Sequence, residues 1–204
     1  MKKYFLGLCW NEKYKPYIHL KDYESGFDEF IDIPQELLIE RINQKICIGT
    51  INPYTREYIS CNNIIEDNSS QCNHCKFMFD FYKCVRCHGD DCYVKNGDVL
   101  KYCNTPHYVY LAYFPNGKIK VGTASEMKKY NRLLEQGAIF SIFIAKTPTG
   151  KIARQIEKNI IDNGITGAVT TTYKMKNIVF LDALSLGECD LSVFQEFGSF
   201  KTYP

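Results

Sequence analysis

Eight of the ten cysteines in this chain of 204 residues lie between Cys47 and Cys103, in a spacing that forms two groups of four. The first group has gaps of thirteen, ten and two residues and consists of Cys47, Cys61, Cys72 and Cys75. The second has gaps of two, four and ten residues and consists of Cys84, Cys87, Cys92 and Cys103. Zinc takes four thiolates in a tetrahedron, and a two-residue gap presents both sulfurs of a pair to one ion. We therefore predict two structural zinc sites.

Histidines lie among these cysteines at His74, His88 and His107. An imidazole nitrogen could replace one sulfur in either site, so the spacing predicts the metal but leaves the ligand sets open. The two remaining cysteines, Cys9 and Cys189, stand alone in the sequence. We expect both to be small buried hydrophobic residues rather than ligands.

Disulfide bonds are the main alternative, and they require an oxidising compartment. Residues 1–10 (MKKYFLGLCW) begin like a signal peptide, with two lysines and an apolar run. The run is short, lacks a small-residue cleavage site and is followed at once by polar residues. No segment approaches the roughly 18 to 20 apolar residues that span a bilayer. We expect a cytoplasmic protein with no membrane contact and with metal-bound thiolates; a redox-sensing thiol cluster is the other alternative.

Positive charge is concentrated in one part of the chain. The net charge is only +2, but residues 101–160 contain ten Lys or Arg against three Asp or Glu. A basic segment favours phosphate backbones as partners, so we predict nucleic acid, DNA or RNA, as the partner. Solvated lysines are the alternative for any one of these residues. The chain has no P-loop and no dinucleotide fingerprint, and we predict no small-molecule cofactor.

The N-terminal half divides into two predicted segments. Residues 1–46 contain three short β-rich runs and are expected to form an antiparallel β segment. Within it, residues 34–41 could form a helical turn, or residues 37–42 a further strand. Residues 47–105 are the cysteine-rich, zinc-ribbon-like region, with weak hydrophobic periodicity. We expect its order to come from the metal.

The segment 106–165 has the clearest pattern. Residues 107–114 and 118–122 predict two strands joined by a Pro-Asn-Gly turn. A helix is predicted over 127–136, ended by Gly137, then a buried strand over 138–146 and a second helix over 148–161. On that helix, Ile152, Ala153, Ile156 and Ile160 share the apolar face, with Arg154, Glu157 and Lys158 outside its centre. The fold class is therefore α+β, with the order β-hairpin, helix, strand, helix.

Residues 166–204 form a C-terminal extension with a weaker pattern. Residues 169–173 and 177–181 could be strands, and residues 191–197 a short helix. No catalytic motif is visible in this extension.

That order of elements resembles the GIY-YIG nuclease domain. Tyr108-Val109-Tyr110 and Lys120-Val121-Gly122 stand where that family has its two triplets, and Arg132 and Glu157 stand where it has an arginine and a metal-binding glutamate. The string HYVYLAYF…KIKVG…RLLEQGA…ARQIE after the first cysteines is similar, over about residues 45–165, to an uncharacterised prokaryotic family, domain of unknown function 2797. That family is grouped with GIY-YIG-like domains, so the resemblance implies a GIY-YIG-like fold here.

The resemblance also implies roles for individual residues. Glu157 would bind Mg²⁺ or Mn²⁺, Arg132 would contact the scissile phosphate, and Tyr110 would accept a proton from water. Lys120 stands in place of a tyrosine and could contact phosphate as a point charge. Gln136 stands where a histidine is common in the GIY-YIG family, and Tyr108 replaces a glycine.

Three functions remain open from the sequence. The first is a zinc-containing, divalent-metal-dependent endonuclease that hydrolyses phosphodiester bonds in DNA or RNA. The second is a non-catalytic nucleic-acid-binding or regulatory protein on the same scaffold. The third is a structural interaction protein with an unknown protein partner, and the absence of salt-sensitive binding to nucleic acid would favour it.

Overall fold

The computed structural model describes residues 3–36, 38, 40, 44–66, 68–177 and 201–202. The chain forms two compact units, the first from Met1–Val85 with Val94–Val99 and the second from Arg86–Tyr93 with Leu100–Pro204. Both units combine helices with antiparallel strands, which confirms the α+β class. The four segments predicted from the sequence are a finer division, and their boundaries stay predictions. None of the described helices is both long and apolar enough to cross a bilayer.

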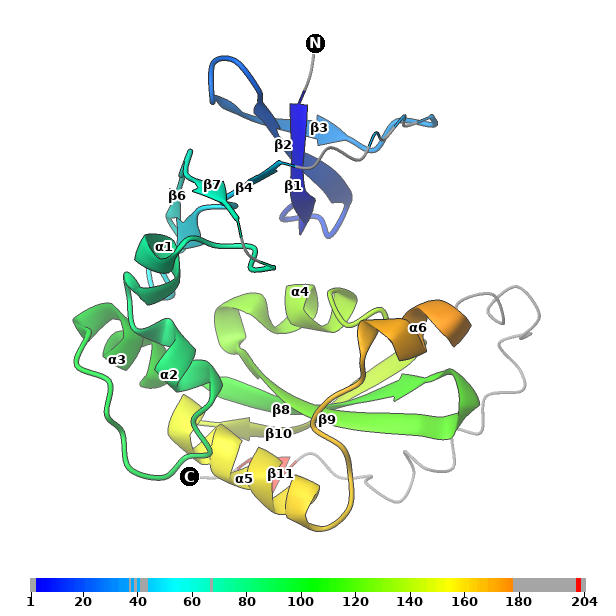
Figure 1. Cartoon of the computed structure of the whole chain (residues 1–204). Coiled ribbons are helices and arrows are strands. Elements are labelled where there is room, and N and C mark those ends of the chain that lie inside the picture. Colours follow the sequence, from blue (N-terminus) through cyan, green and yellow to red (C-terminus); the bar gives the residue numbers. More distant parts are fainter. Residues whose placement is uncertain are drawn as a thin grey trace. The chain divides into compact units, whose positions relative to one another are not determined.

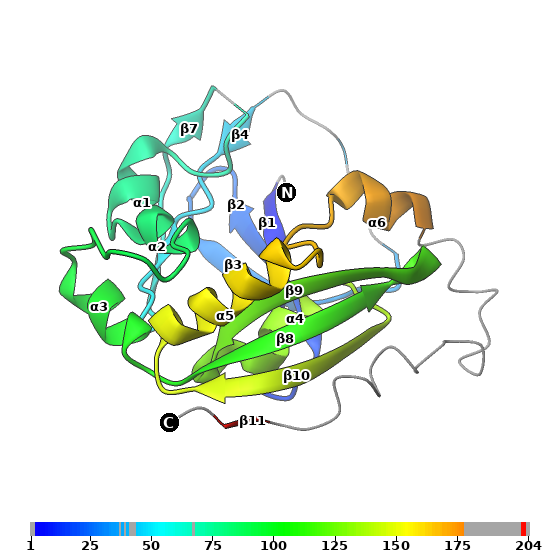
Figure 2. The ribbon, with the colours of Figure 1, turned by 90° about the horizontal axis from the view of Figure 1, so that it is seen from below.

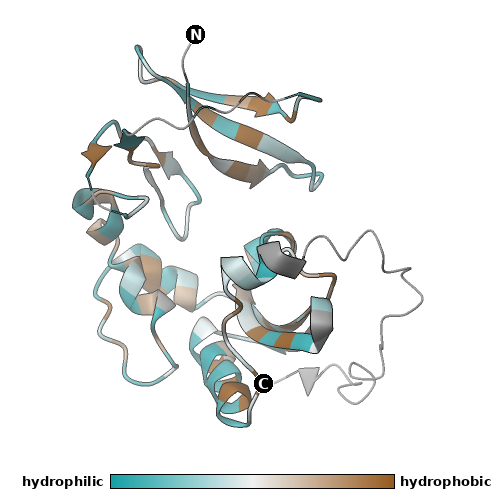
Figure 3. Ribbon diagram, turned by 45° about the vertical axis from the view of Figure 1, so that its right-hand side comes forward, coloured by the Kyte–Doolittle hydropathy of each residue, from teal (hydrophilic) through white to brown (hydrophobic). Residues whose placement is uncertain are grey.

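The first unit begins with a three-stranded antiparallel sheet in the order β1-β2-β3 (Figure 1). Its strands are β1 (Lys3–Trp10), β2 (Pro16–Asp22) and β3 (Asp28–Asp32), which confirms the sheet predicted for this segment. Apolar and polar bands alternate along these strands (Figure 3), as expected where successive side chains point to opposite faces. The described residues among 34–42, which are 34–36, 38 and 40, form neither helix nor strand, and the rest of that prediction lies outside the described residues.

Only very short elements follow. Strand β4 (Lys45–Ile46) pairs with β7 (Ile64–Ile65), and β5 (Thr50–Ile51) pairs with β6 (Tyr58–Ile59). The helices α1 (Asn73–Phe77), α2 (Phe81–Val85) and α3 (Gly97–Cys103) have five to seven residues each. Isolated two-stranded ladders and helices of this length are marginal in water. Their stability must therefore come from another source, and the cysteines between them are the obvious one.

The second unit is built on a four-stranded sheet in the order β11-β10-β8-β9. Strands β8 (His107–Phe114) and β9 (Lys118–Ser125) form the predicted hairpin, joined by a 3₁₀ turn at Pro115–Gly117. In this turn Gly117 takes a positive φ of 77°, a conformation that favours glycine. Strand β10 (Phe140–Thr147) runs antiparallel to β8, and β11 (Lys201–Thr202) runs parallel to β10.

Three helices accompany this sheet. Helix α4 (Lys129–Leu134) follows a 3₁₀ turn at Glu126–Lys128, and Gly137 beyond it has a φ of 61°, as predicted for the residue that ends this helix. Helix α5 (Gly150–Asp162) is capped by Thr149, whose Oγ1 accepts from the Ile152 N–H. The predicted order of hairpin, helix, strand and helix is thus confirmed.

Helix α6 (Thr171–Asn177) corrects one prediction, because residues 169–173 do not form a strand. The run of threonines suggests extended structure, yet Thr170 Oγ1 accepts a hydrogen bond from the Tyr173 N–H at 3.2 Å. A threonine in this position starts a helix, and this local contact prevails over the β propensity of the run. Residues 178–181 and 191–197, where a strand and a helix were predicted, lie outside the described residues.

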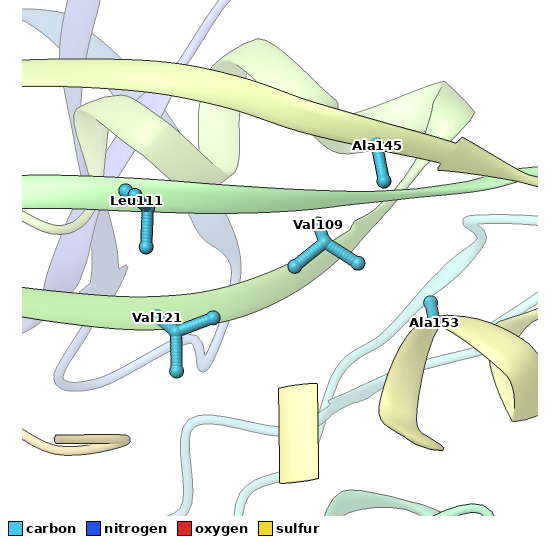
Figure 4. Packing of buried hydrophobic residues seen from close by; sticks show 5 residues of the cluster. All are labelled: Val109, Leu111, Val121, Ala145 and Ala153. Carbon is cyan, nitrogen blue, oxygen red and sulfur yellow. The ribbon is translucent and has the colours of Figure 1, made fainter. Parts of the chain in front are cut away.

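The sheet of the second unit is packed on both faces (Figure 1). On one face, Val109, Leu111, Val121 and Ala145 point toward the side where Ala153 of α5 lies (Figure 4). Helix α5 runs along β8 and β9 in the view from below (Figure 2). On the other face, residues of α4 and α6 pack against a second buried cluster, Tyr110, Ala112, Phe114 and Ala124.

One charged residue of α5 is buried. Arg154 was predicted outside the centre of the apolar face, and its exposed fraction is 7%. The position of Gly150 explains the space it occupies, since a Cβ there would lie 2.7 Å from Arg154 Nη1 and 3.0 Å from the His107 ring. A glycine one turn earlier in the helix thus makes room for a buried guanidinium.

Candidate metal centre and cationic cluster

The four cysteines of the first group come together from separate short elements. Cys47 follows β4, Cys61 follows β6, Cys72 precedes α1, and Cys75 lies within α1. Their sulfurs all lie within 4.8 Å of one another, and Cys61 Sγ and Cys72 Sγ are 3.9 Å apart. Four thiolates about 2.3 Å from a central zinc would be about 3.8 Å apart. The first group therefore forms a cluster that could hold a metal ion such as zinc, and His74, which is exposed, is not part of it.

The surroundings of these sulfurs suit thiolates. The Cys72 N–H donates to Cys47 Sγ at 3.3 Å, and Asn63 Nδ2 donates to Cys72 Sγ at 3.4 Å. A hydrogen bond from the Cys75 backbone, and next the one from Asn63, lower the pKa of Cys72 to about 6. Burial raises the pKa of Cys47 and Cys75, so a cation would be needed to keep these two ionised. Such donors around the ligands are typical of thiolate metal sites.

A buried lysine supports the segment that carries Cys61. Lys21 of β2 has no exposed surface, and its Nζ donates to Ser60 Oγ at 2.5 Å and to Asn62 Oδ1 at 3.0 Å. Its Nζ also lies 3.3 Å from Asp28 Oδ2, so the charge is paired. The two residues on either side of Cys61 are thus fixed by the N-terminal sheet, a contact between segments that sequence alone does not predict.

The second group of cysteines does not form a comparable cluster among the described residues. Cys84 belongs to the first unit, whereas Cys87, Cys92 and Cys103 belong to the second. The second zinc site therefore stays a prediction. The nine described cysteines, Cys9 among them, form no disulfide bonds, and Cys189 lies outside the described residues.

The two other histidines were possible ligands for either site. His88 is exposed, and His107 is buried with its Nδ1 2.8 Å from the Thr105 carbonyl oxygen. Burial lowers the pKa of His107 to about 4, so its ring is neutral at physiological pH. Neither histidine joins a group of metal-ligating side chains in the part of the chain that the structure describes.

In the second unit, Tyr110 and Gly122 face each other across β8 and β9. A Cβ on Gly122 would lie 2.5 Å from both Cζ and the hydroxyl oxygen of Tyr110, so the glycine allows the ring to lie across the strand. Tyr110 is fully buried, and its hydroxyl has no hydrogen-bond partner among the described residues. Burial raises its pKa, an effect that nearby Arg132 opposes.

Two lysines meet at Gln136, directly after α4. Lys120 Nζ donates to Gln136 Oε1 at 2.7 Å, and Lys174 Nζ of α6 donates to the Gln136 carbonyl oxygen at 2.5 Å. Burial, then Arg132 and Lys174, lower the pKa of Lys120 to about 8. Burial and Arg132 lower the pKa of Lys174 as well. We call Lys120, Arg132 and Lys174 the cationic cluster.

Glu157 supplies the negative charge beside this cluster. It comes from α5, and its carboxylate Oε2 accepts from Thr123 Oγ1 of β9 at 3.5 Å. Burial raises the pKa of Glu157, and Arg154, Lys120 and Arg132 counteract the rise. Arg132 is half exposed and pairs with Glu135 at 3.3 Å.

The four site residues predicted from the sequence, Tyr110, Lys120, Arg132 and Glu157, therefore lie close enough to influence one another's charge. Their catalytic roles stay predictions. The sequence did not predict Lys174, which lies in the extension, or the buried Arg154 beside Glu157.

A model of the family described as protein of unknown function, DUF2797, matches residues 35–178. This span contains both the first cysteine group and the cationic cluster. No curated protein and no solved structure matches the chain.

Proposed function

The chain belongs to the DUF2797 family, and we propose that it binds nucleic acid through backbone phosphates at the cationic cluster of its second unit. One observation carries this proposal: two part-buried lysines and an arginine converge beside the part-buried carboxylate of Glu157. The basic segment 101–160 and the resemblance to GIY-YIG nucleases support it. We assign the first cysteine group a structural zinc that orders the first unit.

The electrostatics of the cluster favour an anionic ligand. Three cations in a partly buried site repel one another, and this repulsion contributes to the lowered pKa of Lys120 and Lys174. A phosphodiester would remove the repulsion and accept charge-assisted hydrogen bonds from all three side chains. Glu157, together with the Glu135 that pairs with Arg132, still leaves one of the three positive charges unbalanced. The cluster is therefore arranged for a phosphate group.

Lys120→Ala is expected to weaken binding to labelled DNA and RNA at least about tenfold, since hydrogen bonds between charged groups contribute about 1.5–3 kcal/mol. The slope of log affinity against log salt should also fall by about 1, the signature of one lost phosphate contact. Fluorescence anisotropy at several salt concentrations measures both quantities.

Binding by the wild type should weaken from pH 7 to pH 9, because Lys120 loses its proton near pH 8 while Arg132 stays charged.

The matched control is Lys158→Ala, which removes the same charge from α5. Lys158 is about half exposed and pairs with Asp162 at 3.3 Å, so its loss should change stability little. Equal affinities and equal salt slopes for the two variants would contradict the proposal. Lys120→Ala should also reduce the decrease in affinity between pH 7 and pH 9.

Divalent-metal-dependent hydrolysis of the bound phosphodiester is the second candidate function, and Glu157 favours it. Its carboxylate oxygens are ligands that Mg²⁺ and Mn²⁺ accept, with phosphate oxygens and water completing the set. Burial raises the pKa of Glu157, and a cation would stabilise its ionised form. A metal held there would stabilise charge on the phosphate, and Arg132 would add a second positive charge.

Glu157→Ala is expected to abolish any Mg²⁺- or Mn²⁺-dependent cleavage, while phosphate binding by the cationic cluster persists. The assay is gel analysis of a panel of labelled DNA and RNA, with and without each metal. Glu126→Ala is the control, because Glu126 is 41% exposed and pairs with Lys146. Cleavage equal in both variants would exclude hydrolysis at Glu157.

The environment of Tyr110 makes hydrolysis the second candidate function and phosphate binding the first. A tyrosine that accepts a proton must ionise, and burial raises the pKa of this one. Its hydroxyl is also fully buried, so water would reach it only after the surrounding residues rearrange.

A further inference from the structure

Lys174 lies outside the hairpin, helix, strand and helix that resemble the GIY-YIG domain, yet its place beside Lys120 is well defined. The segment before α6 is attached to β9, because the Val121 N–H donates to the Thr166 carbonyl oxygen at 2.9 Å. The helix is attached at Tyr173, whose hydroxyl donates to the Pro115 carbonyl oxygen at 2.6 Å. Tyr173 also packs against the buried cluster on this face of the sheet. These contacts attach α6 and the segment before it to the middle of β9 and to the turn that precedes β9.

Gln136 connects the two lysines. It is 4% exposed, and it accepts from Lys120 through its side chain and from Lys174 through its backbone. Its Nε2 donates to the Arg132 carbonyl oxygen at 3.3 Å, which fixes the orientation of the amide. An ammonium group has three donors, and each of these contacts uses one of them. Both lysines therefore keep donor capacity for an anion while Gln136 holds their positions.

A glutamine at position 136 suits an anionic ligand better than a glutamate would. A glutamate at position 136 could accept the same hydrogen bonds from Lys120, and its charge would stabilise two neighbouring ammonium groups. It would also neutralise the cluster. A neutral amide orients the lysines and leaves their charge for a ligand.

We propose that α6 completes the phosphate site, and that Lys174 contacts the nucleic-acid backbone together with Lys120. Gln136 is a positioning residue: it holds the two ammonium groups side by side and leaves their positive charge for the ligand. This inference rests on the nucleic-acid binding proposed above and adds an element, the C-terminal helix, to that site.

Three variants test it on the same labelled DNA and RNA panel. Lys174→Ala is expected to lower the salt slope by about 0.7 to 0.9, the value for one phosphate contact, whereas Lys174→Arg should keep the slope. Gln136→Glu is nearly isosteric, and it should weaken binding at least about tenfold by placing a negative charge between the lysines. Its melting temperature should stay close to that of the wild type, since the new ion pair with Lys120 offsets the lost hydrogen bond to the Arg132 carbonyl oxygen.

A purely structural role for these residues predicts a different result. Gln136→Glu would then bind as the wild type does, and Lys174→Ala would show the salt slope of the Lys158→Ala control. Either result, combined with weakened binding by Lys120→Ala, overturns the role of α6 and leaves the proposed function standing. Absence of salt-dependent binding by the wild type overturns both.

Discussion

Replacing Cys75 by serine is expected to remove zinc from the first cysteine group and to unfold the segment from Cys47 to Cys75. Cys75 is 3% exposed, and the strands and helix around it are too short to be stable alone. Structural zinc supplies about 10–16 kcal/mol of apparent binding free energy in small zinc modules, and this energy stabilises the fold. Metal content per chain, measured by mass spectrometry beside circular dichroism, checks the prediction.

Cys9→Ser is the matched control, since it removes one thiol from the N-terminal sheet and should leave the zinc content unchanged. A Cys75→Ser protein that keeps the zinc of the wild type would contradict the assignment of the first group.

The same measurement of metal content tests the second cysteine group. Two zinc ions in the wild type, with one lost in Cys92→Ser, would establish the second site; one ion in both proteins would exclude it.

Gly122→Ala is expected to destabilise the second unit by about 1–3 kcal/mol, the usual cost of forcing extra volume into a packed core. The new Cβ would lie 2.5 Å from ring and hydroxyl atoms of Tyr110, which is fully buried. The Tyr110 ring would have to move away from β9. The side chains on the same face of the sheet, Lys120 among them, would shift with it. Denaturant unfolding measures the loss of stability.

Gly97→Ala serves as the control, because a Cβ there meets nothing within 4 Å and the position starts α3. It should be neutral or slightly stabilising, since alanine lowers the entropy of the unfolded chain. Tyr110→Phe should cost little stability, because the hydroxyl that it removes has no hydrogen-bond partner among the described residues. Equal stability of Gly122→Ala and Gly97→Ala would show that the ring does not need the glycine.

Local patterns were sufficient for much of the second unit. Two short runs joined by the Pro-Asn-Gly turn predict β8 and β9, and Gly137 marks the end of the helix before it. These signals work because each depends on residues a few positions apart. The threonines before α6 misled the prediction, since the same residues favour a strand by propensity and a helix start by hydrogen bonding.

Side-chain environments could not be predicted in the same way. Helical periodicity put Arg154 outside the centre of the apolar face of α5 and did not predict its burial, which the space left by Gly150 beside His107 allows. Lys21 is also fully buried, since Asp28, Ser60 and Asn62 provide its acceptors. Such burial depends on acceptors that are distant in sequence, and no local pattern reports them.

The sequence by itself determined the two cysteine groups, the basic segment and the order of elements that follows it, because spacing, charge and periodicity are properties of neighbouring residues. Only the tertiary structure decided that the first four sulfurs meet, and that Lys174 joins Lys120 at Gln136. The reason is physical. A ligand cluster or a charge cluster requires segments far apart in the chain to meet, and the contacts that bring them together are formed by packing and hydrogen bonds across those segments.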